Sequence, residues 1–365
     1  MAEERDIIII SIPFVAGVAS GLFLVARAGS PVWTPASVSF FTVIAAIALV
    51  LWQFHCGNFR RAEIWTILMF LAAGFFCSTS SSLCSPVIDS AQGLPEKAVG
   101  KLKGIIDSIP YRTAGTGPLV KALLTGDRSG LSKEIVDIFR NSGASHILAL
   151  SGLHLGMVYL LLTKLLLPLG NSRNAKILRY FLIVGASLFY CMMTGAGASL
   201  VRAFLFIFFG ETARLTGRER SPVRILLFSM LVQLVLKPDV FTTLAFQLSY
   251  LAMAGICLIY PFLENLFPEP EGRHRNSLIR KIWQSAALSI SCQMFTAPLV
   301  WYRFHTFPEY FLITNLIALP LTSAIMMLSI ATVVLSGAGI CPEVLVSLDD
   351  QAIQLLVFCL EVISS

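Results

Sequence analysis

Apolar residues in this chain gather into long runs that are separated by short polar segments. A helix needs about 20 apolar residues to cross the hydrocarbon core of a bilayer. Eleven runs are candidates for such helices: 7–26, 36–54, 64–83, 145–167, 177–194, 199–215, 222–236, 242–263, 281–302, 310–335 and 343–363. The pattern therefore predicts an all-α fold, a polytopic transmembrane helix bundle of about 10–11 spans.

The last run, 343–363, is interrupted by two adjacent acidic residues, Asp349 and Asp350. Charged side chains are expensive at bilayer depth, and where they occur they face a bundle interior. We therefore expect this segment to pack inside the bundle or to lie in the membrane interface.

A short polar stretch, 84–144, is expected to form an external segment of amphipathic helices. Residues 94–109 place apolar side chains on one helical face and lysines on the opposite face, as in a helix bound at the bilayer surface. Residues 131–140 predict a second amphipathic helix, with Ser132 as its N-cap and Gly143 just past its end.

These patterns divide the chain into three parts. Residues 1–83 are expected to form N-terminal transmembrane helices, 84–144 the external or interfacial segment, and 145–365 a transmembrane core. The acidic N-terminus MAEERD favours a retained first span over a cleaved signal peptide.

Composition agrees with a membrane protein. The chain is 56% hydrophobic and 13% charged, with a mean hydropathy of +0.78, whereas soluble domains carry about 25% charged residues. This excludes a cytosolic enzyme, a disordered chain and a disulfide-rich secreted module. The eight cysteines form no CxxC pair and the five histidines no metal-ligand spacing, so we expect no metal and no cofactor.

Basic residues in the short loops predict the orientation, because cytoplasmic loops are enriched in Lys and Arg. With the N-terminus in the cytoplasm, the inside segments hold 14 such residues and the short outside loops hold three, Arg27, Lys237 and Arg303. The same orientation places 84–144 outside. We therefore expect a multi-pass protein of the plasma membrane with a cytoplasmic N-terminus.

The segment SHILALSGLHLG, residues 145–156, concentrates polar and small side chains at the start of the fourth run. On one continuous helix, His146 and His154 share a broad polar face. Gly152 and Gly156 have the GxxxG spacing that allows close helix packing. The histidines are expected either to hydrogen-bond a neighbouring helix or to line a polar pathway.

Ser151 and His154 are also spaced as a nucleophile and its base, which would suit an intramembrane serine hydrolase. No third group that would orient the histidine is identifiable. We treat this enzyme as the less favoured alternative and expect a non-enzymatic protein.

Other polar residues recur inside the apolar runs, and polar faces on several helices favour a water-accessible interior. The candidates for that path are Arg202, Gln247, Ser249, Gln293 and Asn315. Hydrogen bonding between helices is the plainer interpretation of any one of them.

Four blocks of the sequence resemble the ComEC-type competence proteins, the inner-membrane channel for transforming DNA in bacteria. They are KALLTGDRSGLSKEIVDIFRNSGASHILALSGLHLG at 121–156, YCMMTGAGASLVRAF at 190–204, LKPDVFTTLAFQLSYLAMAGI at 236–256 and TAPLVWYRFHTFPEYFLITNLIALPL at 296–321. The resemblance extends over about 118–335.

The resemblance implies a channel that moves single-stranded DNA into the cytoplasm of a bacterium across its plasma (inner) membrane. It marks Gly126, Asp127 and Arg128 of the external loop 123–131 as the channel mouth. It also marks His146, Ser151, His154, Arg202 and Gln247 as channel candidates. Arg128 and Arg202 suit contacts with phosphate.

Two parts that are usual in this family have no counterpart in the sequence, an OB-fold domain and a metallo-β-lactamase domain. We interpret the chain as a truncated or split member. Its expected partners are membrane lipid, single-stranded DNA, separate OB-fold, nuclease or motor chains, and further copies of itself in a homo-oligomer. The alternative is a transporter or channel for another anionic solute.

Overall fold

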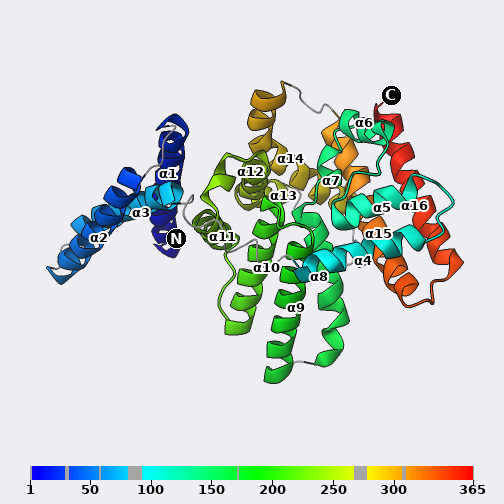
Figure 1. The fold of residues 1–365 in the computed structure, drawn as a ribbon, viewed down its shortest axis with the longest axis horizontal. Coiled ribbons are helices and arrows are strands. Elements are labelled where there is room, and N and C mark those ends of the chain that lie inside the picture. Colours follow the sequence, from blue (N-terminus) through cyan, green and yellow to red (C-terminus); the bar gives the residue numbers. More distant parts are fainter. Residues whose placement is uncertain are drawn as a thin grey trace. The chain divides into compact units, whose positions relative to one another are not determined.

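The computed structural model describes residues 2–28, 33–56, 59–80, 93–170, 172–266, 278–305 and 310–364. Within these ranges every regular element is a helix, which confirms the predicted all-α fold (Figure 1). Arg273 and Arg275, which contribute to the predicted charge asymmetry, lie outside the described residues.

Five described helical segments are long and apolar enough to cross a membrane. They belong to α1 (Ala2–Ala28), α3 (Phe59–Ser80), α8 (Gly152–Leu165) with η3 (Leu167–Leu169), α9 (Arg173–Met193) and α15 (Phe311–Gly337). The remaining elements are α2 (Trp33–His55), α4 (Gly93–Ser108), α5 (Thr116–Thr125), α6 (Lys133–Asn141), α7 (Ser145–Leu148), α10 (Ala198–Thr216), α11 (Pro222–Leu236), η4 (Pro238–Thr242), α12 (Leu244–Leu258), α13 (Tyr260–Glu264), α14 (Leu278–Phe304) and α16 (Glu343–Ser364).

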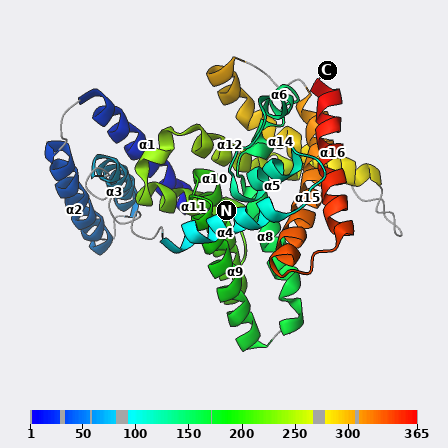
Figure 2. The same cartoon turned by 45° about the vertical axis from the view of Figure 1, so that its right-hand side comes forward.

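The helices form two compact units. Unit 1 comprises 1–90 and 217–250, and unit 2 comprises 91–216 and 251–365, so the boundary falls inside α12. In unit 2, α15 and α16 lie side by side, as do α9 and α10, in both views (Figure 2). α11 and η4 thus belong to the same unit as the N-terminal helices. The predicted external segment, from residue 91 onward, belongs to the same unit as most of the predicted transmembrane core.

Unit 1 is organised by a close crossing of α1 and α3. A Cβ at Gly17 would collide with the carbonyl oxygen of Leu71, and a Cβ at Gly74 would collide with that of Phe14. Only hydrogen at both positions allows the two backbones to approach this closely, which is how small residues promote helix association in membranes.

We expect Gly17→Ala to lower the yield and the melting temperature of the detergent-solubilised protein, because the added methyl group separates the two backbones. Gly185→Ala is the matched control, since a Cβ at that position in α9 meets no described atom within 4 Å. Equal melting temperatures for the two variants would contradict this account of the crossing.

One buried apolar cluster of unit 2 draws on α4, α5, α6, α7, α8, α15 and α16. Ile106 and Ile109 are buried in this cluster, and Leu102 and Ile105 pack against it. The apolar face that predicted a helix lying on the bilayer surface is therefore covered by protein. The prediction of contact with lipid was wrong for the buried Ile106 and Ile109, because neighbouring helices supply their apolar cover.

The second amphipathic helix, α6, begins and ends as its sequence predicts. The Ser132 side chain accepts a hydrogen bond from the Ile135 N–H at 3.3 Å, as an N-cap does. Gly143 follows the helix with a φ of 78°, in the left-handed region that glycine adopts at low cost.

Asp349 and Asp350 of α16 are both fully or almost fully buried, at 0% and 3% exposure. Asp349 accepts hydrogen bonds from Ser329 of α15 at 2.9 Å and from the Tyr111 hydroxyl at 3.1 Å. The expectation that this acidic pair packs inside the bundle is confirmed.

Asp350 accepts hydrogen bonds from three donors, Thr113, Thr116 and Gln354. The donors to both carboxylates are all neutral, and two of these side chains belong to the linker that joins α4 to α5. The acidic pair therefore fastens this linker to α15 and α16.

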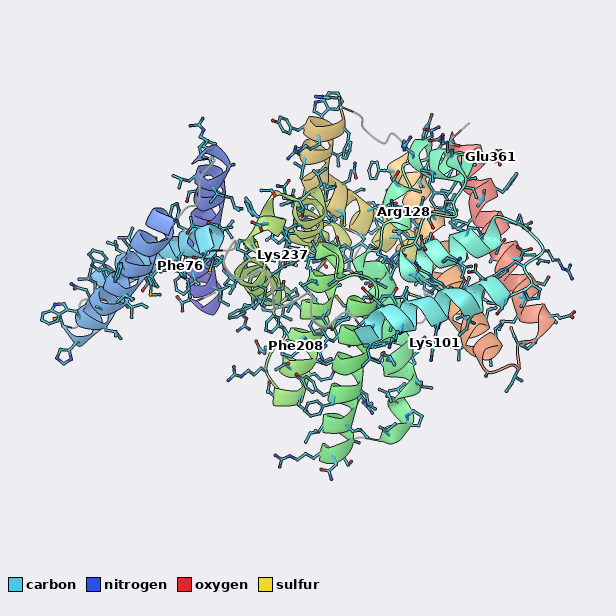
Figure 3. All side chains as sticks on the ribbon, in the orientation of Figure 1. Phe76, Lys101, Arg128, Phe208, Lys237 and Glu361 are labelled. Carbon is cyan, nitrogen blue, oxygen red and sulfur yellow. The ribbon has the colours of Figure 1, made fainter. Side chains whose placement is uncertain are left out.

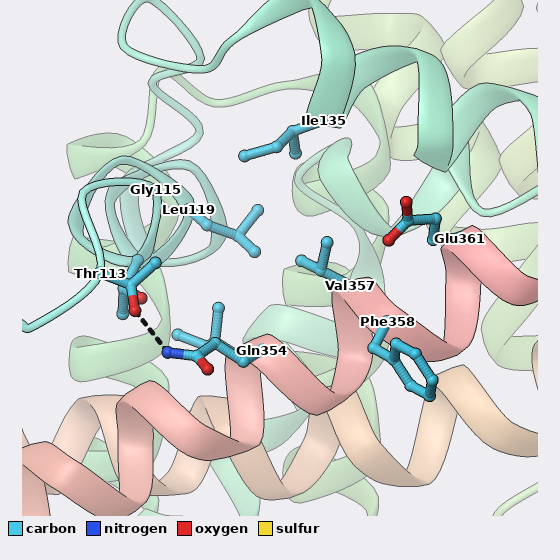
Figure 4. A pocket seen from close by; sticks show the side chains of 10 residues that line it. Thr113, Gly115, Leu119, Ile135, Gln354, Val357, Phe358 and Glu361 are labelled. Carbon is cyan, nitrogen blue, oxygen red and sulfur yellow. Dashed lines mark hydrogen bonds between the residues drawn. The ribbon is translucent and has the colours of Figure 1, made fainter.

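A cavity of about 200 Å³ adjoins the Asp350 network (Figure 4). Its lining includes Thr113, Thr116 and Gln354, apolar side chains of α5, α6 and α16, and the carboxylate of Glu361. Three donors to Asp350 thus border this cavity.

Burial raises the pKa of Asp349 to about 6 from 3.8, and the charge of Asp350 adds to the increase. The native protein therefore holds this proton more tightly than the unfolded chain does. The resulting stabilisation is complete below about pH 4 and is lost as the pH rises through about 6.

We expect Asp349→Asn to match the wild type near pH 4 and to be more stable at pH 7, by at most about 3 kcal/mol. Asparagine carries no charge and keeps an acceptor oxygen for Ser329 or Tyr111. Thermal unfolding across this pH range would measure the difference, with the exposed Asp137→Asn on α6 as control. A difference that does not change with pH would exclude the proton linkage.

Candidate functional site

The segment 145–156 is a broken helix. α7 ends at Leu148, Ala149 and Ser151 adopt extended backbone conformations, and α8 begins at Gly152. His146 lies on α7, where its Nδ1 donates to the Gly143 carbonyl at 3.2 Å. The prediction that His146 and His154 share one face of a continuous helix is therefore wrong.

Ser151 and His154 form a capping box at the start of α8. The Ser151 Oγ accepts from the Leu153 N–H at 3.2 Å, and the Ser151 N–H donates to Nδ1 of His154 at 3.1 Å. Such reciprocal bonds satisfy the free N–H groups at a helix start. The 3.1 Å contact between Ser151 Oγ and His154 Nδ1 belongs to this arrangement.

His154 is buried, with 1% of its surface exposed. Because Nδ1 accepts from the backbone, the proton is on Nε2, and Nε2 has no hydrogen-bond partner among the described residues. Buried donors in folded proteins are nearly always satisfied, so His154 Nε2 is one of the exceptions among the described residues.

The predicted external loop packs directly on the helix break. The Nε of Arg128 donates to the Leu148 carbonyl oxygen at 3.0 Å, and a Cβ at Gly126 would collide with the side chain of Leu150. Gly126 itself has a φ of 78° and ends α5. The loop and the break, which are 20 residues apart in the chain, thus form one structural feature.

Asp127 and Tyr190 fix the loop from two further sides. Asp127 forms a 2.6 Å ion pair with Lys103 of α4 and accepts two hydrogen bonds from Ser129, and these contacts hold the pKa of its carboxyl well below the ordinary value. The hydroxyl of Tyr190, near the end of α9, donates to the Leu124 carbonyl at 3.0 Å.

Arg202 lies at the start of α10, close to the first residue of α8. A Cβ at Gly152 would lie 3.0 Å from the Arg202 guanidinium and 3.4 Å from the Ala203 Cβ. Arg202 is 8% exposed, and its positive charge also lies near Cys257 of α12 and Cys292 of α14. The start of α8 therefore has a buried cation beside it.

Gly152 and Gly156 differ in their surroundings. Gly152 packs against α10, whereas a Cβ at Gly156 would meet no described atom within 4 Å. The close helix approach expected at Gly156 is absent from the described structure, because the contact between α8 and α10 is made one turn earlier.

α8, α9 and α10 have two chemically different ends. The loop, the helix break, the end of α9 and Arg202 meet at one end. At the other end, Glu211 of α10 accepts from Tyr159 of α8 at 2.7 Å and pairs with Arg214 at 3.1 Å. Arg179 of α9 there donates to the Gly170 carbonyl at 2.9 Å.

The remaining predicted residues divide between the two units. Gln293 of α14 and Asn315 of α15 belong to unit 2, and each has a buried polar atom without a hydrogen-bond partner among the described residues. Gln247 and Ser249 belong to unit 1, where Gln247 donates to the Phe241 carbonyl at 2.9 Å. Ser249 likewise has a buried hydroxyl without such a partner.

Sequence reasoning did not find Lys103 and Tyr190 as parts of the site. Lys103 was assigned to the polar face of a surface helix, and Tyr190 lies in an apolar run. Their partners, Asp127 and Leu124, are 24 and 66 residues away, so no local pattern marks these contacts.

Within the described ranges, no group of three or more His, Cys, Asp or Glu side chains comes close enough together to bind a metal ion. The features that meet at the site are a capped helix start, a buried guanidinium and an anchored loop that carries Arg128.

A family model described as "Competence protein" matches residues 123–365. The chain therefore belongs to the competence protein family.

Three curated relatives are similar to parts of the chain. The ComE operon protein 3 of Bacillus subtilis (strain 168) is 28% identical over 203 residues, 55% of this chain and 24% of that protein. The uncharacterized protein YcaI of Escherichia coli (strain K12) is 24% identical over 285 residues, 76% of this chain and 36% of that protein. An uncharacterized protein of Aquifex aeolicus (strain VF5) is 27% identical over 139 residues, 38% of this chain and 32% of that protein.

The chain thus spans between about a quarter and about a third of the length of these relatives. No solved structure matches it.

Replacement of Ser151 separates its capping role from a nucleophilic role. Asparagine is a good N-cap but cannot act as the nucleophile, whereas alanine can do neither. We expect Ser151→Ala to destabilise the protein by about 1 kcal/mol, and Ser151→Asn to retain both stability and function. Thermal unfolding and a cellular DNA-uptake assay would measure this. A stable Ser151→Asn variant without activity would contradict a role for Ser151 in capping alone.

Proposed function

We propose that this protein is a multi-pass protein of the bacterial plasma membrane that takes part in DNA uptake, and that unit 2 provides a path for a single DNA strand. The single observation that carries the proposal is the family match over 123–365. This range contains the anchored loop, the helix break and Arg202, which meet at one end of α8–α10.

The charges at the two ends of α8–α10 support an orientation of unit 2 in which the loop 123–131 lies outside the cell. In this orientation, the end with Arg128 and Arg202 faces outward, and the end with Arg179 and Arg214 faces the cytoplasm. The basic residues at the end with Arg179 and Arg214 then agree with the enrichment of Lys and Arg in cytoplasmic loops. The relative named for the ComE operon supports the same kind of protein.

The chemistry of the outward end suits an anionic strand. Each nucleotide carries one negative charge, and basic groups with access to water attract it in a salt-dependent manner. Arg128, labelled in Figure 3, is exposed on the loop, and Arg202 is buried beside the start of α8. Buried polar atoms of His154, Gln293 and Asn315 have no hydrogen-bond partner among the described residues, which favours a hydrated interior in unit 2.

We expect Arg202→Ala to impair binding and uptake of single-stranded DNA more than it impairs folding. Arg202→Lys should retain part of the activity, because charge survives while the bidentate geometry is lost. Binding would be measured in nanodiscs across a salt titration. Loss of one phosphate contact should reduce the slope of log K against log salt by about 0.7.

Arg140→Ala is the matched control, since Arg140 is exposed on α6 and pairs only with Asp137 among the described residues. Uptake should be tested with the OB-fold and nuclease chains supplied in the same cells. Binding that ignores both salt and the Arg202 substitutions would contradict the DNA path and leave a channel for a smaller anionic solute.

A further inference from the structure

The Arg128 side chain extends from the exposed loop to the helix break, where it forms a hydrogen bond. Its side chain is exposed, yet its Nε donates inward to the Leu148 carbonyl at 3.0 Å. Leu148 is the last residue of α7, and the extended conformation of Ala149 ends the helical hydrogen-bond ladder there. Arg128 therefore supplies a hydrogen bond that the broken helix does not supply itself.

The loop that carries Arg128 is held from several directions. The Gly126 N–H donates to the Ala122 carbonyl at 2.9 Å, Asp127 pairs with Lys103 at 2.6 Å, and Tyr190 donates to Leu124 at 3.0 Å. A side chain presented from such a loop loses little freedom when it binds a ligand, so its position at the surface is prepared in advance.

The guanidinium group has donors to spare. It carries five N–H groups in a planar fork, and the bond to Leu148 uses the one on Nε. The two Nη groups make no hydrogen bond or ion pair with any described residue. Their geometry matches the two oxygens of a phosphate group. One guanidinium can thus donate to a phosphate through its two Nη groups and to the Leu148 carbonyl at the end of α7 through Nε at the same time.

We propose that Arg128 is a positioning residue that couples a phosphate bound at the loop to the conformation of the helix break, 149–151. This inference rests on the proposed function, because the phosphate is that of a DNA strand arriving from outside. A bound phosphate on the two Nη groups fixes the guanidinium plane and so keeps the Nε–H directed at the Leu148 carbonyl. The strand therefore makes the break more rigid, and a rigid break binds the strand more tightly.

Lysine cannot replace arginine in this role. Its ammonium group is a single point charge without a planar fork, so it can attract a phosphate but cannot fix the geometry of both bonds. Arg128→Lys should therefore keep most of the electrostatic attraction and lose the coupling. This difference separates coupling from simple charge.

Hydrogen–deuterium exchange of the intact protein in nanodiscs of zwitterionic lipid tests the proposal, with binding of an oligothymidylate measured in parallel. In the wild type, we expect saturating oligonucleotide to slow amide exchange in 149–153 several-fold. In Arg128→Lys, the oligonucleotide should bind while exchange in 149–153 stays within twofold of the free protein. Arg140→Lys, which alters an exposed arginine on α6, should respond as the wild type does.

Two results would overturn the coupling while leaving the proposed function intact. One is bound oligonucleotide with no change of exchange in the wild type, which does not depend on any variant folding correctly. The other is equal slowing in Arg128→Lys. Failure of the oligonucleotide to bind the wild type would instead remove the proposed function, and the coupling with it.

A second arm uses nanodiscs that contain anionic phosphatidylglycerol and no oligonucleotide. Lipid headgroups carry the same phosphate chemistry, so they could occupy the Arg128 fork. Slowing of 149–153 by this lipid alone, with no further effect of the oligonucleotide, would assign the fork to lipid and overturn the assignment to DNA. Slowing only with the oligonucleotide supports it.

Discussion

Backbone groups that are taken out of a helix inside a membrane protein must find other partners, and this constraint shapes the centre of unit 2. Where 145–165 breaks at Ala149, the Ser151 and His154 capping box satisfies the start of α8, and Arg128 satisfies the carbonyl at the end of α7. Since Arg128 can reach Leu148 only from the loop, the loop must pack on the break. Gly126, Asp127 and Tyr190 secure that packing.

The same constraint gives the site its chemistry. A break in a helix brings an arginine, a buried histidine and a second arginine, Arg202, to one end of α8–α10. Apolar helices alone would exclude the two buried groups, His154 and Arg202. Residues that satisfy the broken backbone therefore also make that end basic and polar, which is the property that an anionic strand requires.

Local sequence rules predicted the helices and the N-cap of α6, Ser132, but not the N-cap of α8, Ser151. Ser132 was recognised because a polar loop precedes it and an amphipathic pattern follows it. Ser151 obeys the same capping rule, but the apolar residues around it, Leu148 and Leu150 among them, favoured one continuous helix over 145–167. Hydropathy reports where a segment is buried and is insensitive to a short break within it.

Contacts between distant segments lie beyond local rules. Nothing near Asp350 indicates that Thr113 and Thr116 will bind it, and nothing near Leu124 indicates Tyr190. The apolar face of α4 shows the converse problem, because an amphipathic helix has the same pattern whether lipid or protein covers it. Such contacts are set by the packing of the whole unit.

The most direct test of the central claim is to crosslink a photoreactive single-stranded oligonucleotide to the protein in nanodiscs and to identify the crosslinked peptides by mass spectrometry. If the anchored loop and the helix break form the entrance for the strand, crosslinks should concentrate in 124–131, in 149–154 and at the start of α10. Crosslinks confined to unit 1, or to the end of α8–α10 that holds Arg179 and Arg214, would contradict the account.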